Sequence, residues 1–284
     1  FRKTSMLHGP LLNRPLSYHA RSLGLLIFLP SAFFTSLLVV SSCSFQRAPG
    51  VTWALALAQL CLALLFLVVK HHGAGPKFWF NLGGLCFFAT VFGVAAGLWN
   101  YSCNLYKFWT YQGQPVYEDV DPSANALSFL DAGELHFTQG SAVDVSRAFT
   151  HRGGDGTMLC LAPITGSGPS GGIVQFWAVG VACCDDGFHC GDVLNADARG
   201  GSVLLEDPLY AGNMVDQFRK AALTFGGQSA PDALFVIWAA HPSEIAFGHW
   251  RHGVAFMLCA CGLHLALSVF LGFAMHFGRR GGKP

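Results

Sequence analysis

The sequence predicts an integral membrane protein with four transmembrane α-helices and one disulfide-bonded α+β domain between the third and fourth helices. Three observations predict this class. Hydrophobic residues make up 52% of the 284 residues and charged residues only 12%, about half the charged share of soluble proteins. Four long stretches contain no Asp, Glu, Lys or Arg. All 16 acidic residues lie between Glu118 and Glu244.

Each charge-free stretch is long enough to cross about 30 Å of hydrocarbon, which takes about 20 helical residues. A buried helix of a soluble protein is usually shorter and shows a polar stripe. Tryptophans mark the boundaries of these stretches, as is typical of the headgroup zone of a bilayer. The predicted spans are residues 22–43, 51–69, 78–101 and 253–277.

The distribution of Lys and Arg predicts how the chain is oriented. Nine cations and no acid lie before the first span, between the second and third spans, and in the C-terminal tail. Residues 102–252 carry seven cations against sixteen acids, a formal balance of −9. We therefore expect both termini on the cytosolic, stromal or matrix side. The acidic domain is expected on the opposite, lumenal or extracellular side.

These boundaries divide the chain into five parts. The parts are a basic N-terminal segment (1–21), transmembrane helices 1–3 (22–101), the acidic domain (102–252), transmembrane helix 4 (253–277) and a basic tail (278–284). The basic segment either lies on anionic lipid or is disordered. Since the sequence begins at Phe1, a removed transit segment is a further expectation.

The acidic domain is predicted to be α+β from its hydrophobic periodicity. One amphipathic helix is expected at residues 210–225, between Pro208 and the Gly226-Gly227 pair. Strand-like runs occur at residues 134–138, 157–164, 173–183, 202–205 and 234–239.

The third and fourth spans contain small residues that favour close helix packing. Gly93 and Gly97 form a G-x-x-x-G pattern, and Gly262, Ala266 and Gly272 follow the fourth span. Small side chains let helix backbones approach each other in lipid. The general frequency of glycine in membrane helices is the alternative explanation.

The spans contain no acidic or basic residue apart from His264 in the middle of the fourth span and His276 at its end. A coupled ion transporter normally needs an intramembrane ionisable group, so that class is not favoured. His264 is a candidate ligand for haem or chlorophyll, and a hydrogen bond between helices is the alternative use of its imidazole. No cofactor is required by the sequence.

Six of the ten cysteines fall on the predicted non-cytosolic side. An even number of cysteines on an oxidising face predicts disulfide bonds. Six cysteines allow 15 pairings, and adjacent cysteines such as Cys183 and Cys184 rarely pair with each other. The candidates are Cys43, Cys103, Cys160, Cys183, Cys184 and Cys190.

Motifs of catalysis and metal binding are not found. The spacing of Cys183, Cys184 and Cys190 does not match the C-x₂₋₄-C of zinc sites, so no metal site is predicted. The glycine-rich run at residues 166–172 matches G-x-G-x-x-G, but a strand-like run follows it where a dinucleotide site needs a helix. The letters of residues 168–172 also fit G-x-S-x-G, but a strand-like run follows them where a nucleophile elbow needs a helix, and no H-E-x-x-H or P-loop occurs. The protein is predicted to be non-enzymatic, and its acidic balance argues against nucleic acid as a partner.

A set of short motifs in the acidic domain resembles a known family. They are Tyr117-Glu-Asp-Val-Asp-Pro122, Asp131-Ala-Gly133, Val143-Asp144, Cys160-Leu-Ala-Pro-Ile164, Phe176-Trp-Ala-Val-Gly180, Cys183-Cys184 and Phe188-x-Cys190-Gly191. Through them, residues 111–242 resemble a family of alveolate, mainly dinoflagellate, membrane proteins in which hydrophobic spans flank one such domain. The family has no assigned biochemical function. Residues 230–243 match it only loosely.

The resemblance implies that Cys160, Cys183, Cys184 and Cys190 pair among themselves. Cys43 and Cys103 are then expected to form a third bridge. The four spans, with a short first loop and a large second loop that holds a Cys-Cys pair, also resemble the tetraspanin plan. The Cys-Cys-Gly of tetraspanins is missing because Asp185 follows the pair.

These features lead us to expect a structural or accessory subunit of a multi-protein membrane assembly. Its partners would be the lipid bilayer and other membrane proteins, contacted through helix faces and the acidic domain. The alternatives are a tetraspanin-like surface organiser or receptor for a soluble ligand, and a pigment- or haem-binding subunit. A plasma or internal membrane is expected, with the thylakoid membrane as the alternative.

Overall fold

The computed structural model describes residues 15–68, 76–154, 156–167, 172–205, 214–225 and 228–277. Most of the predicted basic N-terminal segment, the loop between the second and third spans, and the tail 278–284 lie outside these residues. The chain divides into two compact units. We call residues 1–103 with 252–284 the helical unit, and residues 104–251 the sheet domain.

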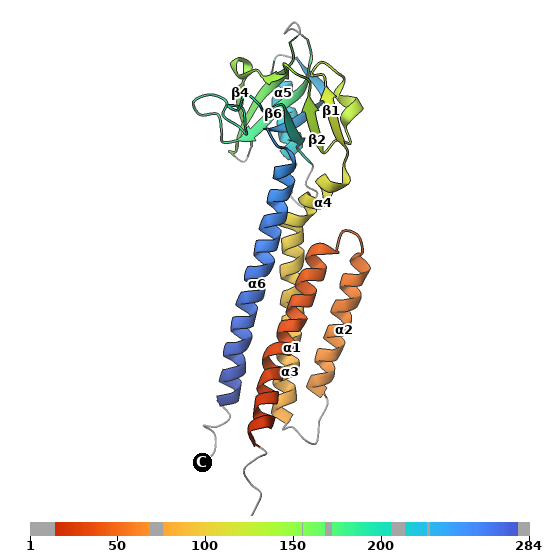
Figure 1. Ribbon diagram of the computed structural model, residues 1–284, viewed down its shortest axis with the longest axis vertical. Helices are drawn as coiled ribbons and strands as arrows, with labels where there is room; N and C mark the ends of the chain where they lie inside the picture. The colour runs from red at the N-terminus through yellow and green to blue at the C-terminus, as the bar shows by residue number, and fades with distance from the viewer. Residues whose placement is uncertain are drawn as a thin grey trace, which may run out of the picture. The chain divides into compact units, whose positions relative to one another are not determined.

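Four long helices are drawn in Figure 1: α1 (Pro15–Cys43), α2 (Pro49–Val68), α3 (Pro76–Asn100) and α6 (Ser243–Phe277). The first three begin at a proline, whose fixed φ suits the first turn and whose missing N–H is not needed there. All four are long and apolar enough to cross a membrane. The candidate spans are Ser22–Cys43, Pro49–Val68, Phe78–Gly113 and Ser243–Met275.

Two of these helices extend further than their apolar stretches predict. The chain continues from α3 through a π-helical turn (Tyr101–Leu105) into α4 (Tyr106–Gly113). No glycine or proline stands between Gly97 and Gly113 to end the helix earlier. Helix α6 begins directly after Pro242. Apolar length marks the part of a helix that suits hydrocarbon, and it does not mark where the helix ends.

Helices α1 and α3 pack closely at glycines. A Cβ atom built on Gly97 would lie 2.6 Å from Cβ of Ser41, and one on Gly93 would lie 2.9 Å from the carbonyl oxygen of Phe34. Near the end of α3, the Asn100 side chain donates hydrogen bonds to Oγ of Ser42 (3.1 Å) and to the carbonyl of Gly253 (3.2 Å). This buried amide therefore links α3 to both α1 and α6.

Within the described part of the sheet domain, eight strands form one mixed sheet. Its order is β1-β2-β7-β8-β6-β5-β3, and β4 pairs with β5. The pairs β1–β2 and β6–β8 are parallel, and the other pairs are antiparallel. The strands are β1 (Val116–Val120), β2 (Glu134–Phe137), β3 (Ala142–Val143), β4 (Phe149–Arg152), β5 (Met158–Thr165), β6 (Val174–Val181), β7 (Gly200–Val203) and β8 (Ser229–Ala239).

The alternation of side chains along β6 creates two hydrophobic cores. Trp177 packs on one face with Phe218 of α5 (Met214–Leu223), which covers that side of the sheet. Phe176 packs on the other face with Phe137 and Trp238. Successive strand residues point to opposite faces, so the near-continuous apolar run of β6 serves both cores.

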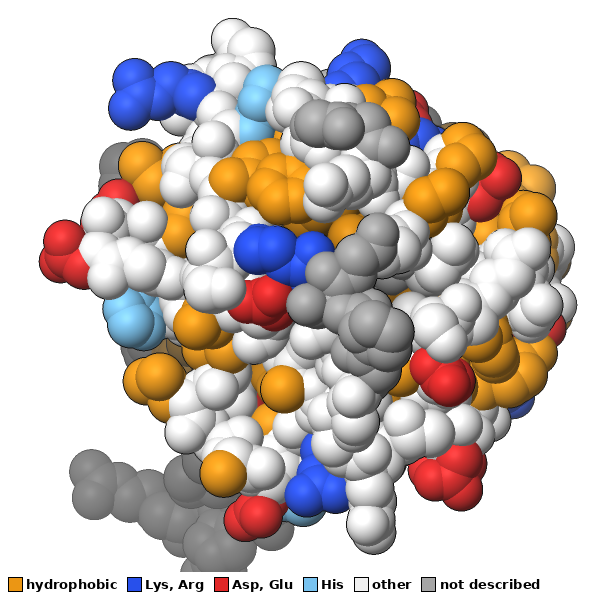
Figure 2. Space-filling view, turned by 90° about the horizontal axis from the view of Figure 1, so that it is seen from above, with side chains coloured by type: hydrophobic (Ala, Val, Ile, Leu, Met, Phe, Trp, Pro, Cys, Tyr) orange, Lys and Arg blue, Asp and Glu red, His pale blue; other side chains and the backbone are white. Residues whose placement is uncertain are grey.

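The surface of the sheet domain mixes charge types. Figure 2 shows acidic, basic and hydrophobic side chains spread over the face that it draws, and the acids are not gathered in one place. The domain has more acids than bases in its sequence, but the described acids on this face do not form one acidic patch.

Candidate functional site

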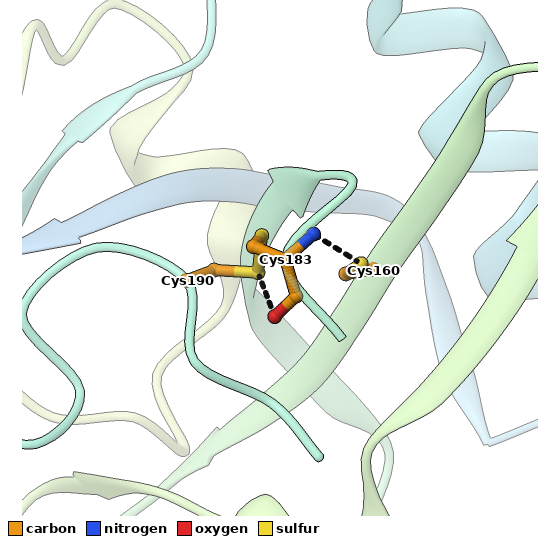
Figure 3. Close-up of side chains that lie close together, drawn as sticks. All are labelled: Cys160, Cys183 and Cys190. Carbon is orange, nitrogen blue, oxygen red and sulfur yellow. Dashed lines mark hydrogen bonds between the residues drawn. A yellow bond between two sulfur atoms is a disulfide. The ribbon is translucent and has the colours of Figure 1, made fainter. Parts of the chain in front are cut away.

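Two disulfide bonds lie side by side in the sheet domain. Cys160 pairs with Cys184, and Cys183 pairs with Cys190. Figure 3 shows three of these residues, and their sulfur atoms lie within 4.8 Å of one another. The backbone N–H of Cys183 also donates to Sγ of Cys160 over 3.4 Å. The adjacent cysteines thus bridge in different directions.

The local backbone positions these bridges. Cys160 lies on β5 directly opposite Gly180 on β6. A side chain on Gly180 would overlap Sγ of Cys183 and lie 2.6 Å from Sγ of Cys190, so the glycine leaves the space that the second disulfide fills. Ala182 then takes a φ of +53°, a left-handed conformation that turns the chain directly before the two cysteines.

This sulfur cluster has the residue types of a metal site but not its chemistry. Zinc binds the thiolate form of cysteine, whereas Cys160, Cys183 and Cys190 are all joined in disulfides. The Cys160–Cys184 bridge instead connects β5 to the chain that follows β6, and the Cys183–Cys190 bridge closes a short loop within that chain. Each closed loop stabilises the folded domain by about 2–4 kcal/mol.

The third bridge expected from the resemblance is not formed. Cys43, the last residue of α1, and Cys103, in the π-helical turn, both carry free thiols. This corrects the expected pairing.

A cavity of about 330 Å³ lies elsewhere in the sheet domain. It forms where the turn after β1 and the loop after β2 meet the end of β5 and the start of β6. Its charged lining residues are Asp121 and Arg147. The remaining lining residues are Pro122, Ser123, Thr138, Gln139, Ile164, Thr165, Gly166, Ser167, Gly172, Ile173 and Val174.

Both charged groups at this cavity are held by local contacts. Oδ1 of Asp121 accepts hydrogen bonds from the backbone N–H and the hydroxyl of Ser123, both 2.8 Å long, and these bonds hold the pKa of Asp121 below its usual range. Nε of Arg147 donates to Oδ2 of Asp144 over 2.7 Å. The cavity thus presents one carboxylate and one oriented guanidinium.

His264 contacts two neighbours in the helical unit. Its ring stacks on Phe34 with centroids 4.1 Å apart, and its Nδ1 lies 3.4 Å from Oγ of Ser268. The ring therefore contributes to the α1–α6 contact and to a contact within α6. Haem or chlorophyll binding at His264 stays a prediction.

The small residues of α6 lie in different surroundings. A Cβ on Gly272 would lie 2.9 Å from a side-chain carbon of Ile27, so this residue packs on α1. A Cβ on Gly262 would meet nothing within 4 Å, and Ala266 is exposed. Together with exposed Ala255 and Cys259, these two residues follow one helix face at three- and four-residue spacing. We call Ala255, Cys259, Gly262 and Ala266 the small face of α6.

Comparison with known proteins identifies no relative. No family model matches the chain, and no curated protein or solved structure shows a significant match to it. The resemblance to the alveolate family therefore stays a prediction. The features of the chain that bear on its function are the four candidate spans, the sulfur cluster, the cavity and the exposed helix face.

Sequence reasoning did not identify Asn100 or the cavity. Asn100 carries no charge and lies at the end of a span, so a search of the spans for ionisable residues does not find it. The cavity joins segments up to about fifty positions apart, from Asp121 to Val174. The sequence did contain one indication that Arg147 is held by a neighbour, because Asp144 stands three residues before it.

Proposed function

We propose that this protein is a non-enzymatic subunit of a multi-protein membrane assembly, which it joins through α6. The observation that carries the proposal is the exposure of α6. Only 6% of an 18-residue window of its span is buried, against 39%, 22% and 39% in the other three spans. Much of this helix therefore has no protein neighbour among the described residues.

The small face of α6 supports a protein partner in addition to lipid. Lipid chains cover large apolar side chains as well as a protein partner does. Helix α6 carries such residues in Leu258 and Leu263, which are 70% and 74% exposed. Small residues instead let a second helix approach closely, and in a bilayer this contact is a main source of association. A transmembrane helix of another protein is the occupant that fits this face.

The sheet domain supports the same role. Its two disulfides suit an oxidising compartment, and the acids of the chain are confined to this region of the sequence. We infer that the domain lies on the lumenal or extracellular side and the chain ends on the opposite side. A disulfide-stabilised domain in that compartment presents a stable surface to partner proteins.

The test uses the full-length protein solubilised from its native membrane in mild detergent. Wild type should migrate on a native gel well above the mass of one chain, and co-purifying proteins should cross-link to Cys259. Gly262→Leu should release the chain as a monomer, because the larger side chain holds the partner helix away.

Leu267→Phe is the control, since Leu267 is 53% exposed but lies roughly 80–140° around the helix from the residues of the small face. It should leave the assembly intact. Migration of the wild type as a bare monomer would contradict the proposal, and so would an assembly that contains only copies of this chain.

A further inference from the structure

The cavity of the sheet domain has the size and lining of a site for a small polar ligand. Its volume of about 330 Å³ is at the lower end of the roughly 300–1,000 Å³ that ligand pockets span. Buried Pro122, Ile164 and Val174 supply apolar lining, and hydroxyl and amide groups surround them. This combination is typical of pockets that hold and orient a ligand.

The lining disfavours several ligand classes. Its described part contains no aromatic side chain, so these residues offer no stacking surface for a nucleobase and no cage for a quaternary ammonium group. The lining residues that the structure describes include one cation and one acid. A ligand with several phosphates would need more positive charge than Arg147 provides, because Asp144 already pairs with that side chain.

Arg147 is oriented so that part of its guanidinium is available. Asp144 accepts from Nε of Arg147 and also from the N–H and hydroxyl of Ser146, which hold the carboxylate in place. Within the described residues, the structure records no further partner for the two Nη groups. A guanidinium offers five N–H donors in a planar fork, which matches a carboxylate well.

Asp121 supplies the complementary charge. Its Oδ1 is occupied by the two hydrogen bonds from Ser123. Its Oδ2 has no recorded partner in the described part of the chain. These bonds favour the ionised carboxylate, so Oδ2 is a charged acceptor at neutral pH.

We propose that this cavity binds a free α-amino acid. The ligand carboxylate lies on the Nη groups of Arg147, the ligand ammonium lies on Oδ2 of Asp121, and the ligand side chain contacts Ile164 and Val174. The proposal goes beyond membership of an assembly and does not depend on α6. It makes the sheet domain a receptor for a small soluble ligand.

The test is calorimetric titration of the full-length protein in detergent micelles with each of the twenty standard amino acids. At least one should bind with a Kd of about 1 mM or tighter. The N-acetyl and the carboxamide derivatives of the best ligand each lack one charge and should bind at least tenfold more weakly. Glucose serves as an uncharged polar probe and should not bind.

Variants of the two charged residues test the assignment. Asp121→Asn keeps an Oδ1 acceptor for Ser123 but removes the charge, and should weaken binding at least tenfold. Arg147→Lys keeps the charge but removes the planar fork, and should also weaken binding. Arg219→Lys is the matched control, because Arg219 pairs with Asp216 at the same three-residue spacing outside the cavity. It should bind as wild type does.

Three results would overturn the proposal: no amino acid binds, both blocked derivatives bind as tightly as the free amino acid, or Asp121→Asn binds like wild type. The thermal midpoint of each ligand-free variant shows whether it is folded. If Arg147→Lys fails to fold, Asp121→Asn alone decides the outcome. The gel migration that tests the α6 contact is independent of all these measurements.

Discussion

Gly180 shows how one missing side chain makes room for a disulfide. Its backbone lies opposite Cys160, and the sulfur atoms of Cys183 and Cys190 occupy the space where its Cβ would be. Two cysteine pairs can therefore form beside each other on one face of the sheet.

We expect Gly180→Ala to destabilise the sheet domain by about 1–3 kcal/mol, as overpacking of a dense core does. The thermal midpoint should fall, by about 2–4 °C for each kcal/mol, and the yield of the Cys183–Cys190 disulfide should fall with it. Differential scanning fluorimetry and non-reducing peptide mapping measure the two effects.

Gly154→Ala is the control for this prediction, because a Cβ there meets nothing within 4 Å. Its midpoint should stay close to that of wild type. Equal midpoints for Gly154→Ala and Gly180→Ala would show that the space beside Cys183 does not require glycine.

The lowered pKa of Asp144 predicts how the stability of the sheet domain depends on pH. Hydrogen bonding from Ser146 and the neighbouring Arg147 hold the pKa of Asp144 below its usual range of about 3.9. The unfolded chain then binds more protons than the folded chain around and below that pH, so the carboxylate stabilises the fold above its usual pKa and this contribution is lost as the pH falls. Asp144→Asn should therefore lower stability at pH 7 by roughly 1 kcal/mol. The difference in stability between Asp144→Asn and wild type should become smaller below about pH 4.

Thermal midpoints measured from pH 2.5 to 7 check this expectation. Asp216→Asn removes the acid of the similar but more exposed pair with Arg219 and should cost less than about 0.5 kcal/mol. A gap between Asp144→Asn and wild type that stays constant over the whole pH range would contradict the assignment.

At the scale of secondary-structure elements, the contact between α1 and α3 depends on Gly97. A Cβ there would lie 2.9 Å from the carbonyl oxygen of Leu38 and close to Cβ of Ser41. Backbone atoms cannot rotate away as a side chain can, so Gly97→Ala should push the two helices apart. We expect a lower thermal midpoint in detergent and faster proteolysis of the helical unit.

Gly84→Ala provides the comparison on the same helix. A Cβ at Gly84 meets nothing within 4 Å, and alanine has a higher helix propensity than glycine. This variant should be as stable as wild type or slightly more stable. If both variants behaved alike, close packing at Gly97 would not contribute to the helical unit.

At the scale of the whole molecule, charge segregation predicts the membrane topology. Carboxylates are costly within a bilayer, and Lys and Arg favour the cytosolic side. We expect a membrane-impermeant maleimide to label Ser5→Cys and Ser128→Cys from opposite sides of sealed vesicles. Labelling of both positions from one side would contradict the topology and the oxidising environment expected for the disulfides.

The candidate spans could be predicted from sequence because each is a local property. A helix in lipid satisfies its backbone hydrogen bonds within itself, so a run of about 20 apolar residues is enough to predict a span. The runs that became β5, β6 and β8 were predictable for a similar reason, since buried strands are continuous in apolar residues. The runs that became β2 and β7 were also predicted, with boundaries up to two residues away from those observed. The helix predicted at residues 210–225 was also correct in type: its described part contains α5, and its predicted start lies outside the described residues.

Strands β1 and β4 were not predicted because their sequences are poor strand signals. The first contains Glu118 and Asp119, and the second contains His151 and Arg152. Strand β7 was predicted too late in the chain because Gly200 and Gly201 weaken any strand pattern. The structure explains Gly201, since a Cβ there would lie 2.5 Å from the carbonyl oxygen of Ile237 on the neighbouring strand β8.

The sequence by itself determined which segments are apolar enough to cross a membrane, where the acids lie, and that the cysteines of the domain can pair. Only the tertiary structure decided which cysteines pair, that Cys43 and Cys103 do not, how parallel and antiparallel strands share one sheet, and that Asp121 and Arg147 line one cavity. The physical reason is the distance along the chain over which each property is determined. Apolar length and charge are summed along the chain, whereas a disulfide, a strand pairing or a cavity depends on distances between residues far apart in sequence.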